Sequence, residues 1–432
     1  MRLRISRVKF QHLFHLATLV VVTFIVFRAT SDLDVRLQNG ASSSDCPFIR
    51  MAIINSVFYH AEVWYSYMYA ATKCQWHVSL FTRVLPFNKN RDSSFANITS
   101  SWSRVLLSVA ERHVGELLTS TTEICSHEII FIGTLNISYL KRLLHVLSQE
   151  CDRLKTYLVL IQLHEANRDL QQLNNTFKNL RFALNSTRIE VRLLALGLHV
   201  KKYAEIHIKE RLQVDLWIPV FPLDLPVSDN THDARGDLEF TVQGSLDPTR
   251  RDYKTFVNDI KRWADVLRQH RVIFNVIGQA RILSVYKYLH SPHIRLLSKT
   301  HYIPASDYYG LIHKSIGMIP IFVNEHYYEN TQSSTIGCSI LTRTPMFASR
   351  RLLDTNGYLT EEAVWLKEEN ESDVEAVIQI LSKYPSHDEF QEALYDKRKQ
   401  LALLAESSYE KNRQTLFDYA NELNIRKNRL MS

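Results

Sequence analysis

The chain has 432 residues, 45% of them hydrophobic, and this length predicts two or three domains. Glycine is scarce, because 11 glycines in 432 residues are about 2.5%, against a usual value of about 7%. The scattered glycines form neither a G-x-G-x-x-G nor a P-loop sequence, which argues against a P-loop NTPase, a protein kinase and a standard dinucleotide-binding domain. The formal net charge of +7 is spread along the chain, so we expect no nucleic-acid partner.

The N-terminal segment has the pattern of a membrane anchor. Basic side chains within residues 1–9 precede an apolar run at 10–28. A cleaved signal peptide is the alternative interpretation, but no clear A-x-A cleavage site follows the run. We favour an uncleaved transmembrane signal anchor at 10–28, with residues 1–9 in the cytosol because basic residues flank the cytosolic side.

This topology predicts a single-pass type II protein of the Golgi or ER membrane, with the bulk of the chain in the lumen. Residues 29–46 are polar and serine-rich, as expected for a stem between the membrane and a folded domain. Sequons of the form N-x-[ST] support a lumenal location. They predict N-glycosylation at Asn97, Asn136, Asn174, Asn185 and Asn370.

The five cysteines have no C-x-x-C spacing, so the sequence predicts no structural zinc site. We also expect no catalytic metal and no resident cofactor. In an oxidising lumen, Cys46–Cys74 or Cys125–Cys151 could form a disulfide, and the sequence leaves the pairing open.

In the first half, short apolar runs alternate with helical patterns, which predicts a parallel sheet covered on both faces. We expect strands at Ile49–Asn55, His77–Thr82, Glu128–Gly133, Tyr157–Leu163, Val191–Leu196 and Leu216–Phe221. Helices are expected at 60–73, 103–118, 138–151 and 166–184. Residues 47–220 are therefore assigned to an N-terminal α/β domain, and the Pro- and Asp-rich residues 221–237 to a linker.

The second half repeats this alternation. We expect strands at Glu239–Gln243, Val272–Ile277, Ile294–Leu297, Gly317–Phe322 and Pro345–Ala348. Helices are expected at 250–269, 279–289, 306–315, 333–342, 373–383 and 387–423. Residues 238–395 are assigned to a second α/β domain and residues 396–432 to a helical tail.

Ligands of open α/β sheets bind beyond the carboxyl ends of the strands, which directs attention to polar residues at those positions. In the first domain, His164 and His199 are catalytic candidates, because an imidazole there can act as a general base on an acceptor hydroxyl. The candidates for acceptor binding are Asn55, His60, Glu62, His164 and Glu165.

In the second domain, Arg250 and Arg251 stand at the start of a helix, after a strand that ends at Gly244. Cations oppose the dipole at a helix N-terminus, and a nearby anionic ligand would account for them. A guanidinium can bind phosphate oxygens in bidentate fashion. The stretch 327–334 supplies hydroxyls, an amide and a second helix N-terminus, which together suit a diphosphate or sugar hydroxyls.

These features resemble the donor-binding half of GT-B glycosyltransferases, particularly the retaining, GT4-like group. The resemblance spans about residues 47–360 and includes the stretch YYENTQSSTIGCSILTRTPMFAS at 327–349. It implies two Rossmann-like domains and donor binding by Gln243, Gly244, Arg250, Arg251, Tyr253, Gly278, Asp307, Tyr308, Tyr328, Glu329, Asn330, Ser333, Ser334 and Thr335. The E-x7-E signature of that group would fall near Asn330 and Cys338, and Glu329 lies one position away.

The resemblance implies a metal-independent hexosyltransferase that moves a sugar from a nucleotide-sugar to a hydroxyl of a glycan, lipid or small molecule. Arg250 and Arg251 would hold the diphosphate and stabilise the charge of the leaving group. The alternative interpretation is a catalytically inactive lumenal protein that binds glycans or protein partners, because loss of the paired glutamates is typical of a degenerate enzyme.

Overall fold

The computed structural model describes residues 49–55, 61–74, 76–82, 109–179, 188–224, 236–278, 289–297, 303–323 and 325–431. The predicted cytosolic segment 1–9, the anchor and the stem lie outside these residues, as do most of the predicted linker, Cys46, His60, Asn97, Asn185 and the side chain of Glu62. Within the described part of the chain, no helix is long and apolar enough to span a membrane.

The first sheet is fully parallel, with strand order β3-β2-β1-β4-β5-β6-β7. Its strands are β1 (Arg50–Asn55), β2 (His77–Thr82), β3 (Val109–His113), β4 (Ile129–Ile132), β5 (Tyr157–Leu163), β6 (Ile189–Ala195) and β7 (Gln213–Leu216). The order reverses between β1 and β4, as in doubly wound folds, where ligands bind at such a switch point.

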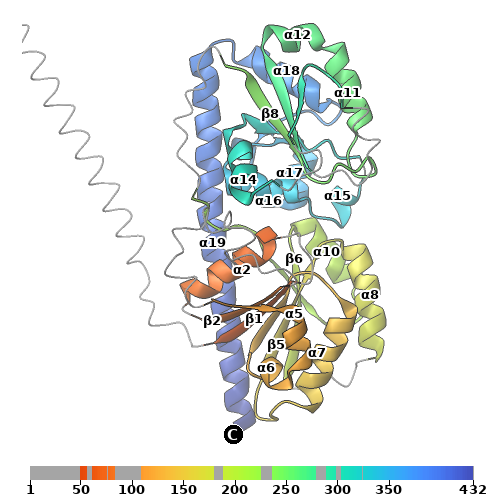
Figure 1. Cartoon of the computed structure of the whole chain (residues 1–432), viewed down its shortest axis with the longest axis vertical. Helices are drawn as coiled ribbons and strands as arrows, with labels where there is room; N and C mark the ends of the chain where they lie inside the picture. The colour runs from red at the N-terminus through yellow and green to blue at the C-terminus, as the bar shows by residue number, and fades with distance from the viewer. Residues whose placement is uncertain are drawn as a thin grey trace, which may run out of the picture. The chain divides into compact units, whose positions relative to one another are not determined.

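Helices cover both faces of this sheet (Figure 1). One face forms a core with the apolar sides of α5 (Val114–Thr119), α6 (Thr121–Cys125), α7 (Ile137–Gln149), α8 (Ala166–Asn179) and α10 (Leu198–His207). On the other face lies α2 (Ala61–Lys73), whose Tyr67 stacks on Phe131 of β4 with ring centroids 3.7 Å apart.

Two predictions for the first half are wrong, the first of them in part. The helix predicted at 103–118 is confirmed at 114–118, where α5 lies, but residues 109–113 form β3, which pairs with β2 at the edge of the sheet, and residues 103–108 lie outside the described part of the chain. The strand predicted at Leu216–Phe221 lies at 213–216 instead. The apolar residues after it are buried without being a strand, and Trp217 stacks on Tyr67 at 3.7 Å.

The second sheet is a smaller parallel sheet of order β10-β9-β8-β11. Its strands are β8 (Leu238–Gln243), β9 (Val272–Ile277), β10 (Ile294–Leu296) and β11 (Gly317–Met318). A parallel bridge from Met318 to Met346 joins it to the strand pair β12 (Phe347–Ala348) and β13 (Trp365–Leu366). The order again reverses beside the first strand, so β8 and β11 flank a second switch point.

Within the described residues, the second half contains the helices α11 (Tyr253–Arg262), α12 (Ala264–Gln269), α14 (Ala305–Lys314), α15 (His326–Glu329), α16 (Ser334–Thr342), α17 (Arg350–Asn356) and α18 (Asp373–Lys383), followed by the last helix of the chain. The single helix predicted at 250–269 is thus divided at Trp263. The helix predicted at 279–289 lies outside the described residues except for its last position.

The last helix, α19 (His387–Met431), is continuous, so the boundary predicted at 395/396 falls inside a helix. It binds both halves of the molecule (Figure 1). Arg398 donates to the carbonyls of His313 and Ser315, at 2.9 and 3.0 Å. Asn412 donates to the Ile218 carbonyl of the first half at 2.8 Å.

The further course of α19 runs along the first sheet toward the amino ends of its strands. Tyr419 donates to Asp215 of β7 at 2.7 Å, and Arg426 pairs with Glu190 at the start of β6 at 2.6 Å. The predicted tail is therefore an integral layer of the first half.

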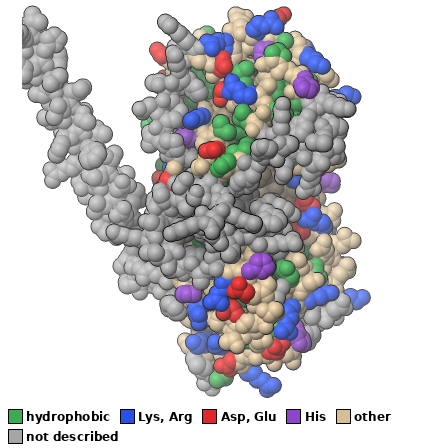
Figure 2. All heavy atoms as spheres, viewed as in Figure 1, with side chains coloured by type: hydrophobic (Ala, Val, Ile, Leu, Met, Phe, Trp, Pro, Cys, Tyr) green, Lys and Arg blue, Asp and Glu red, His purple; other side chains and the backbone are tan. Residues whose placement is uncertain are grey.

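Of the two disulfides left open by the sequence, Cys125–Cys151 is present and joins the ends of α6 and α7. Basic and acidic side chains are interspersed over the described part of the face in Figure 2. Several of them form ion pairs, for example Arg142 with Glu150 at 3.0 Å.

Candidate functional site

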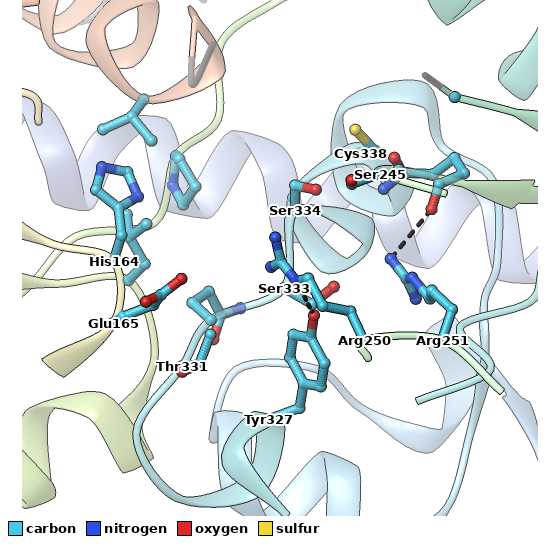
Figure 3. A pocket seen from close by; sticks show the side chains of 18 of the residues that line it. His164, Glu165, Ser245, Arg250, Arg251, Tyr327, Thr331, Ser333, Ser334 and Cys338 are labelled. Carbon is cyan, nitrogen blue, oxygen red and sulfur yellow. Dashed lines mark hydrogen bonds between the residues drawn. The ribbon is translucent and has the colours of Figure 1, made fainter. Parts of the chain in front are cut away.

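A cavity of about 520 Å³ lies beyond the carboxyl ends of strands from both sheets (Figure 3). The first half contributes the residues that follow β4, β5 and β6, and the second half those that follow β8 and β9 together with the start of α16. The two switch-point regions thus share one cavity, which is the arrangement that places a ligand between two Rossmann-like domains.

Arg250 projects its guanidinium into this cavity (Figure 3). Its Nε donates to the Tyr327 hydroxyl at 2.8 Å, and the guanidinium lies 5.8 Å from the Tyr327 ring centroid. Within the described residues, Arg250 forms no ion pair with a carboxylate. Tyr327 therefore orients a cation whose charge is available to an anionic ligand.

Arg251, the neighbouring residue, has a different role. Its guanidinium is buried and donates to the carbonyls of Pro320 and Gln243 and to Thr335 Oγ1, the last at 2.9 Å. Burial lowers the pKa of this guanidinium. The donors of Arg251 bind protein acceptors, so it ties the end of β8 to the start of α16.

Gln243 belongs to the same buried network. Its Nε2 donates to Thr335 Oγ1 at 3.0 Å, and its Oε1 accepts from the Tyr308 hydroxyl at 2.8 Å. Tyr308 lines the cavity together with Gln243, so this network forms part of the wall.

The N-terminus of α16 opens on the cavity. Ser333 caps the helix by accepting from the Thr335 N–H at 3.3 Å, and Ser333 and Ser334 line the cavity. The rest of the helix is buried, which holds its N-terminal N–H groups in place. A helix N-terminus beside a guanidinium favours an anion such as a phosphate.

On the first-half side, His164 and Glu165 line the cavity, and the carboxylate of Glu165 points into it (Figure 3). The His164 Nε2 lies 2.6 Å from the Gly133 carbonyl. Arg168, in the first turn of α8, pairs with Glu165 at 3.0 Å. Glu165 is the only carboxylate among the described lining residues.

His199 does not line this cavity. It is 7% exposed, and its ring lies between the Thr331 and Thr355 carbonyls, at 3.2 and 3.3 Å. Burial lowers its pKa. His199 instead lines a second, more open cavity together with Tyr328.

The structure brings together most of the donor candidates but not all. Those that line the cavity are Gln243, Gly244, Arg250, Arg251, Gly278, Tyr308, Ser333 and Ser334. Thr335 is joined to them by hydrogen bonds. Outside the lining are Tyr253 in the hydrophobic core, exposed Asp307 and Glu329, buried Asn330 and, in the first half, buried Asn55.

Arg168 and Cys338 are lining residues that the sequence did not single out as binding residues, whereas Tyr327 belongs to the stretch 327–334 that it did single out. Arg168 comes shortly after Leu163, the predicted end of a strand, and this position is the sequence feature that could have identified it as a binding residue. Cys338 lies near the position that the resemblance gives to the second glutamate of the E-x7-E signature, and it lines the cavity with a thiol instead of a carboxylate.

Three predicted glycosylation sites fall within the described residues. Asn370 is exposed, whereas Asn136 caps α7 by accepting from the Ser138 N–H at 3.1 Å. Asn174 is tied at both ends of its amide, because Nδ2 donates to the His207 carbonyl and Oδ1 accepts from Lys209.

No protein-family model matches the chain, and no curated protein matches it. Solved structures do. The sucrose-phosphate synthase of Thermosynechococcus elongatus aligns with 12% identity and a TM-score of 0.55 over 87% of this chain and 99% of its own. HepE of Anabaena in complex with UDP aligns with 12% identity and a TM-score of 0.54 over 86% of this chain and 99% of its own.

The α,α-trehalose-phosphate synthase (UDP-forming) of Burkholderia vietnamiensis aligns with 10% identity and a TM-score of 0.51, over 87% of this chain and 100% of its own. These likenesses show that the chain has the GT-B glycosyltransferase fold, as predicted from the sequence.

Proposed function

We propose that the protein is a glycosyltransferase that moves a sugar from a nucleotide-sugar donor to a hydroxyl acceptor. The observation that carries this proposal is the pairing of Arg250 with the α16 N-terminus in a cavity between two Rossmann-like domains. Structures of HepE hold UDP, or UDP-glucose, within the same fold, which supports a nucleotide-sugar as donor.

In this proposal the diphosphate lies between the Arg250 guanidinium and the N–H groups that begin α16. The leaving nucleotide gains negative charge as the glycosidic bond breaks, and a fixed cation and helix dipole stabilise that charge. Arg251 acts by holding Thr335 and the end of β8 in register with Arg250. Because guanidinium and backbone N–H groups can perform this role, the proposed reaction needs no metal ion.

The acceptor lies on the first-half side, beside His164 and Glu165. Glu165 is a hydrogen-bond acceptor that can receive the proton of a sugar hydroxyl, and Arg168 fixes its orientation through their ion pair. The transferred sugar is proposed to be a hexose, as the sequence resemblance implies. A glycan, a lipid or a small molecule remains the proposed acceptor class.

We further propose the retaining, GT4-like chemistry implied by the sequence resemblance, and a type II location in the Golgi or ER membrane. The basic and apolar residues 1–28 and the N-x-[ST] sequons support this location. The disulfide Cys125–Cys151 is consistent with an oxidising lumen.

The second candidate is a protein of the same fold that binds glycans or partners without catalysis. One observation favours it, namely that Asn330 and Cys338 stand where the resemblance places two glutamates. The two candidates differ in whether the cavity turns over a nucleotide-sugar.

The proposal is tested by thermal unfolding of the full chain with UDP, GDP and their glucose conjugates, followed by assays of nucleotide release. We expect one nucleotide to raise the Tm of the wild-type protein, because a ligand that binds only the folded state stabilises it. Arg250→Ala should weaken nucleotide binding by about 10- to 100-fold, as expected for loss of a charged hydrogen-bonding group.

Arg268→Ala is the matched control, since Arg268 is an exposed arginine of α12 that pairs with Asp265. It should leave both the Tm shift and turnover unchanged. A Tm shift without nucleotide release would favour the binding protein, and the absence of any shift with these nucleotides would contradict the donor site.

A further inference from the structure

Two segments from opposite halves of the molecule pair along the wall of the cavity. The Ala166 N–H donates to the Asn330 carbonyl at 2.8 Å, and the Gln332 N–H donates to the His164 carbonyl at 3.4 Å. Between these bonds, Glu165 and Thr331 form an antiparallel bridge. We call residues 164–166 and 330–332 the seam.

The hydrogen-bond pattern of the seam sets the direction of the Thr331 carbonyl. Both cross-seam bonds are made by the neighbours of Glu165 and Thr331, so these two residues are a non-hydrogen-bonded pair. In such a pair, the N–H and carbonyl groups point away from the partner strand. The Thr331 carbonyl therefore needs a partner from outside the seam, because Thr331 is buried, with 8% of its surface exposed.

His199 is that partner. Its Nε2 lies 3.2 Å from the Thr331 carbonyl, and its Nδ1 lies 3.3 Å from the Thr355 carbonyl of α17. The ring stands at the start of α10, so it joins the first half to the second at the back of the seam. Its burial leaves little room for water to replace it.

We propose that His199 is a positioning residue that holds the seam closed through the Thr331 carbonyl and thereby keeps Glu165 facing Arg250 across the cavity. The catalytic consequence rests on the proposed function, whereas the closure of the seam does not. A neutral imidazole donates one hydrogen bond. Because burial lowers the pKa of His199, the ring at neutral pH donates to only one of the two carbonyls, that of Thr331 or that of Thr355. The proposal assigns that bond to Nε2.

Two substitutions at His199 distinguish the hydrogen bond to Thr331 from the packing of the ring. Both remove the ring, and they differ in which carbonyl the new amide nitrogen can reach. In His199→Gln the amide nitrogen takes the place of Nε2 and can still reach Thr331. In His199→Asn the amide nitrogen takes the place of Nδ1, which faces Thr355, and the Thr331 carbonyl loses its donor. Hydrogen exchange at the Ala166 and Gln332 amides reports the opening of the seam directly, without any assay of catalysis.

We expect roughly tenfold faster exchange at both amides in His199→Asn, from loss of one buried hydrogen bond, and near wild-type exchange in His199→Gln. Where transfer is measurable, His199→Asn should lower kcat with little change in the KM for the donor, and His199→Gln should restore it. Equal exchange in the two variants would overturn the proposal, because it would assign His199 to packing alone.

The tautomer of the wild-type ring provides a measurement that needs no variant to fold. The chemical shifts of the His199 ring in the unmodified full chain should show the proton on Nε2. A proton on Nδ1 would overturn the proposal, because the ring would then serve Thr355. If wild-type protein showed no transfer with any donor, the exchange and tautomer results would still decide whether the seam depends on His199.

Discussion

Gly278 lies so close to Gly244 that a Cβ built on Gly278 would be 1.7 Å from the Gly244 carbonyl oxygen. Gly244 itself has φ +118°, a conformation that side chains rarely adopt. The ends of β8 and β9 therefore approach at the cavity only because both residues are glycine. In a chain with so few glycines, these two shape the proposed donor site.

Gly278→Ala should therefore open the cavity wall and abolish nucleotide binding. The contact is with backbone, which cannot move aside as a side-chain end can, so we expect a loss of about 3 kcal/mol or more in the free energy of unfolding. Denaturant unfolding and nucleotide-induced Tm shifts measure the two effects. Gly310→Ala is the control, because its Cβ would meet no atom within 4 Å and it lies inside α14. That control should stabilise the protein by about 0.5–1 kcal/mol.

The adjacent arginines should respond in opposite ways. Arg251→Ala removes a buried donor from the Pro320 and Gln243 carbonyls and from Thr335, and should cost about 3–5 kcal/mol of folding stability. Arg250→Ala should change stability by about 1 kcal/mol or less, because Tyr327 is its principal protein contact. Urea unfolding of both variants checks this difference. Equal destabilisation by the two would contradict the roles assigned here.

His127 should make the protein sensitive to acid. It is fully buried, with Nε2 2.9 Å from Ser79 Oγ and Nδ1 2.9 Å from the Glu123 carbonyl, and burial lowers its pKa to about 4. The unfolded chain binds this proton near pH 6.5, so between these values the unfolded state holds more protons. Stability must then fall as the pH falls, by about 3 kcal/mol in total.

Unfolding measured at intervals from pH 7 to pH 4 tests this expectation. His127→Gln, which keeps an amide nitrogen near the Nε2 position, should unfold with a shallower pH dependence over that interval. If stability depends on pH equally in His127→Gln and in the wild-type protein, other groups cause the acid sensitivity.

The disulfide Cys125–Cys151 should stabilise the fold by lowering the conformational entropy of the unfolded chain. It closes a loop of 26 residues, and cross-linking a loop of this length stabilises a fold by about 3 kcal/mol. The double substitution Cys125→Ser, Cys151→Ser should lower the Tm by several degrees. Reducing agent should lower the Tm of the wild-type protein similarly and leave that of the double variant unchanged.

Local patterns in the sequence predicted much of the fold, and the exceptions have physical reasons. Tyr157–Leu163 is an apolar run interrupted only by Gln162 and forms β5 with those bounds, because it is buried on both faces. The polar segment Val109–His113 is an edge strand. It is held by backbone pairing with its neighbour and therefore lacks the apolar pattern that predicts a buried strand. The apolar run after Leu216 is explained by aromatic stacking of Trp217, a contact between residues far apart in the chain.

The same contrast holds at the candidate site. Arg250 and Ser334 lie beside predicted strand ends and helix starts, so their place in the cavity could be predicted. The burial of Arg251 could not, since its acceptors come from three separate segments. His199 lies 132 residues before Thr331, and local sequence carries no sign of their hydrogen bond.

The long helix α19 also sets an order for folding during synthesis. Its residues Asn412 and Arg426 bind Ile218 and Glu190 in the first half, although about two hundred residues separate each pair in the sequence. The surface of the first half that α19 covers beside α2 therefore stays exposed until these late residues leave the ribosome, which follows from synthesis in the N-to-C direction. During that interval the second half is synthesised beside an incomplete partner, with the apolar residues under α19 still open to solvent.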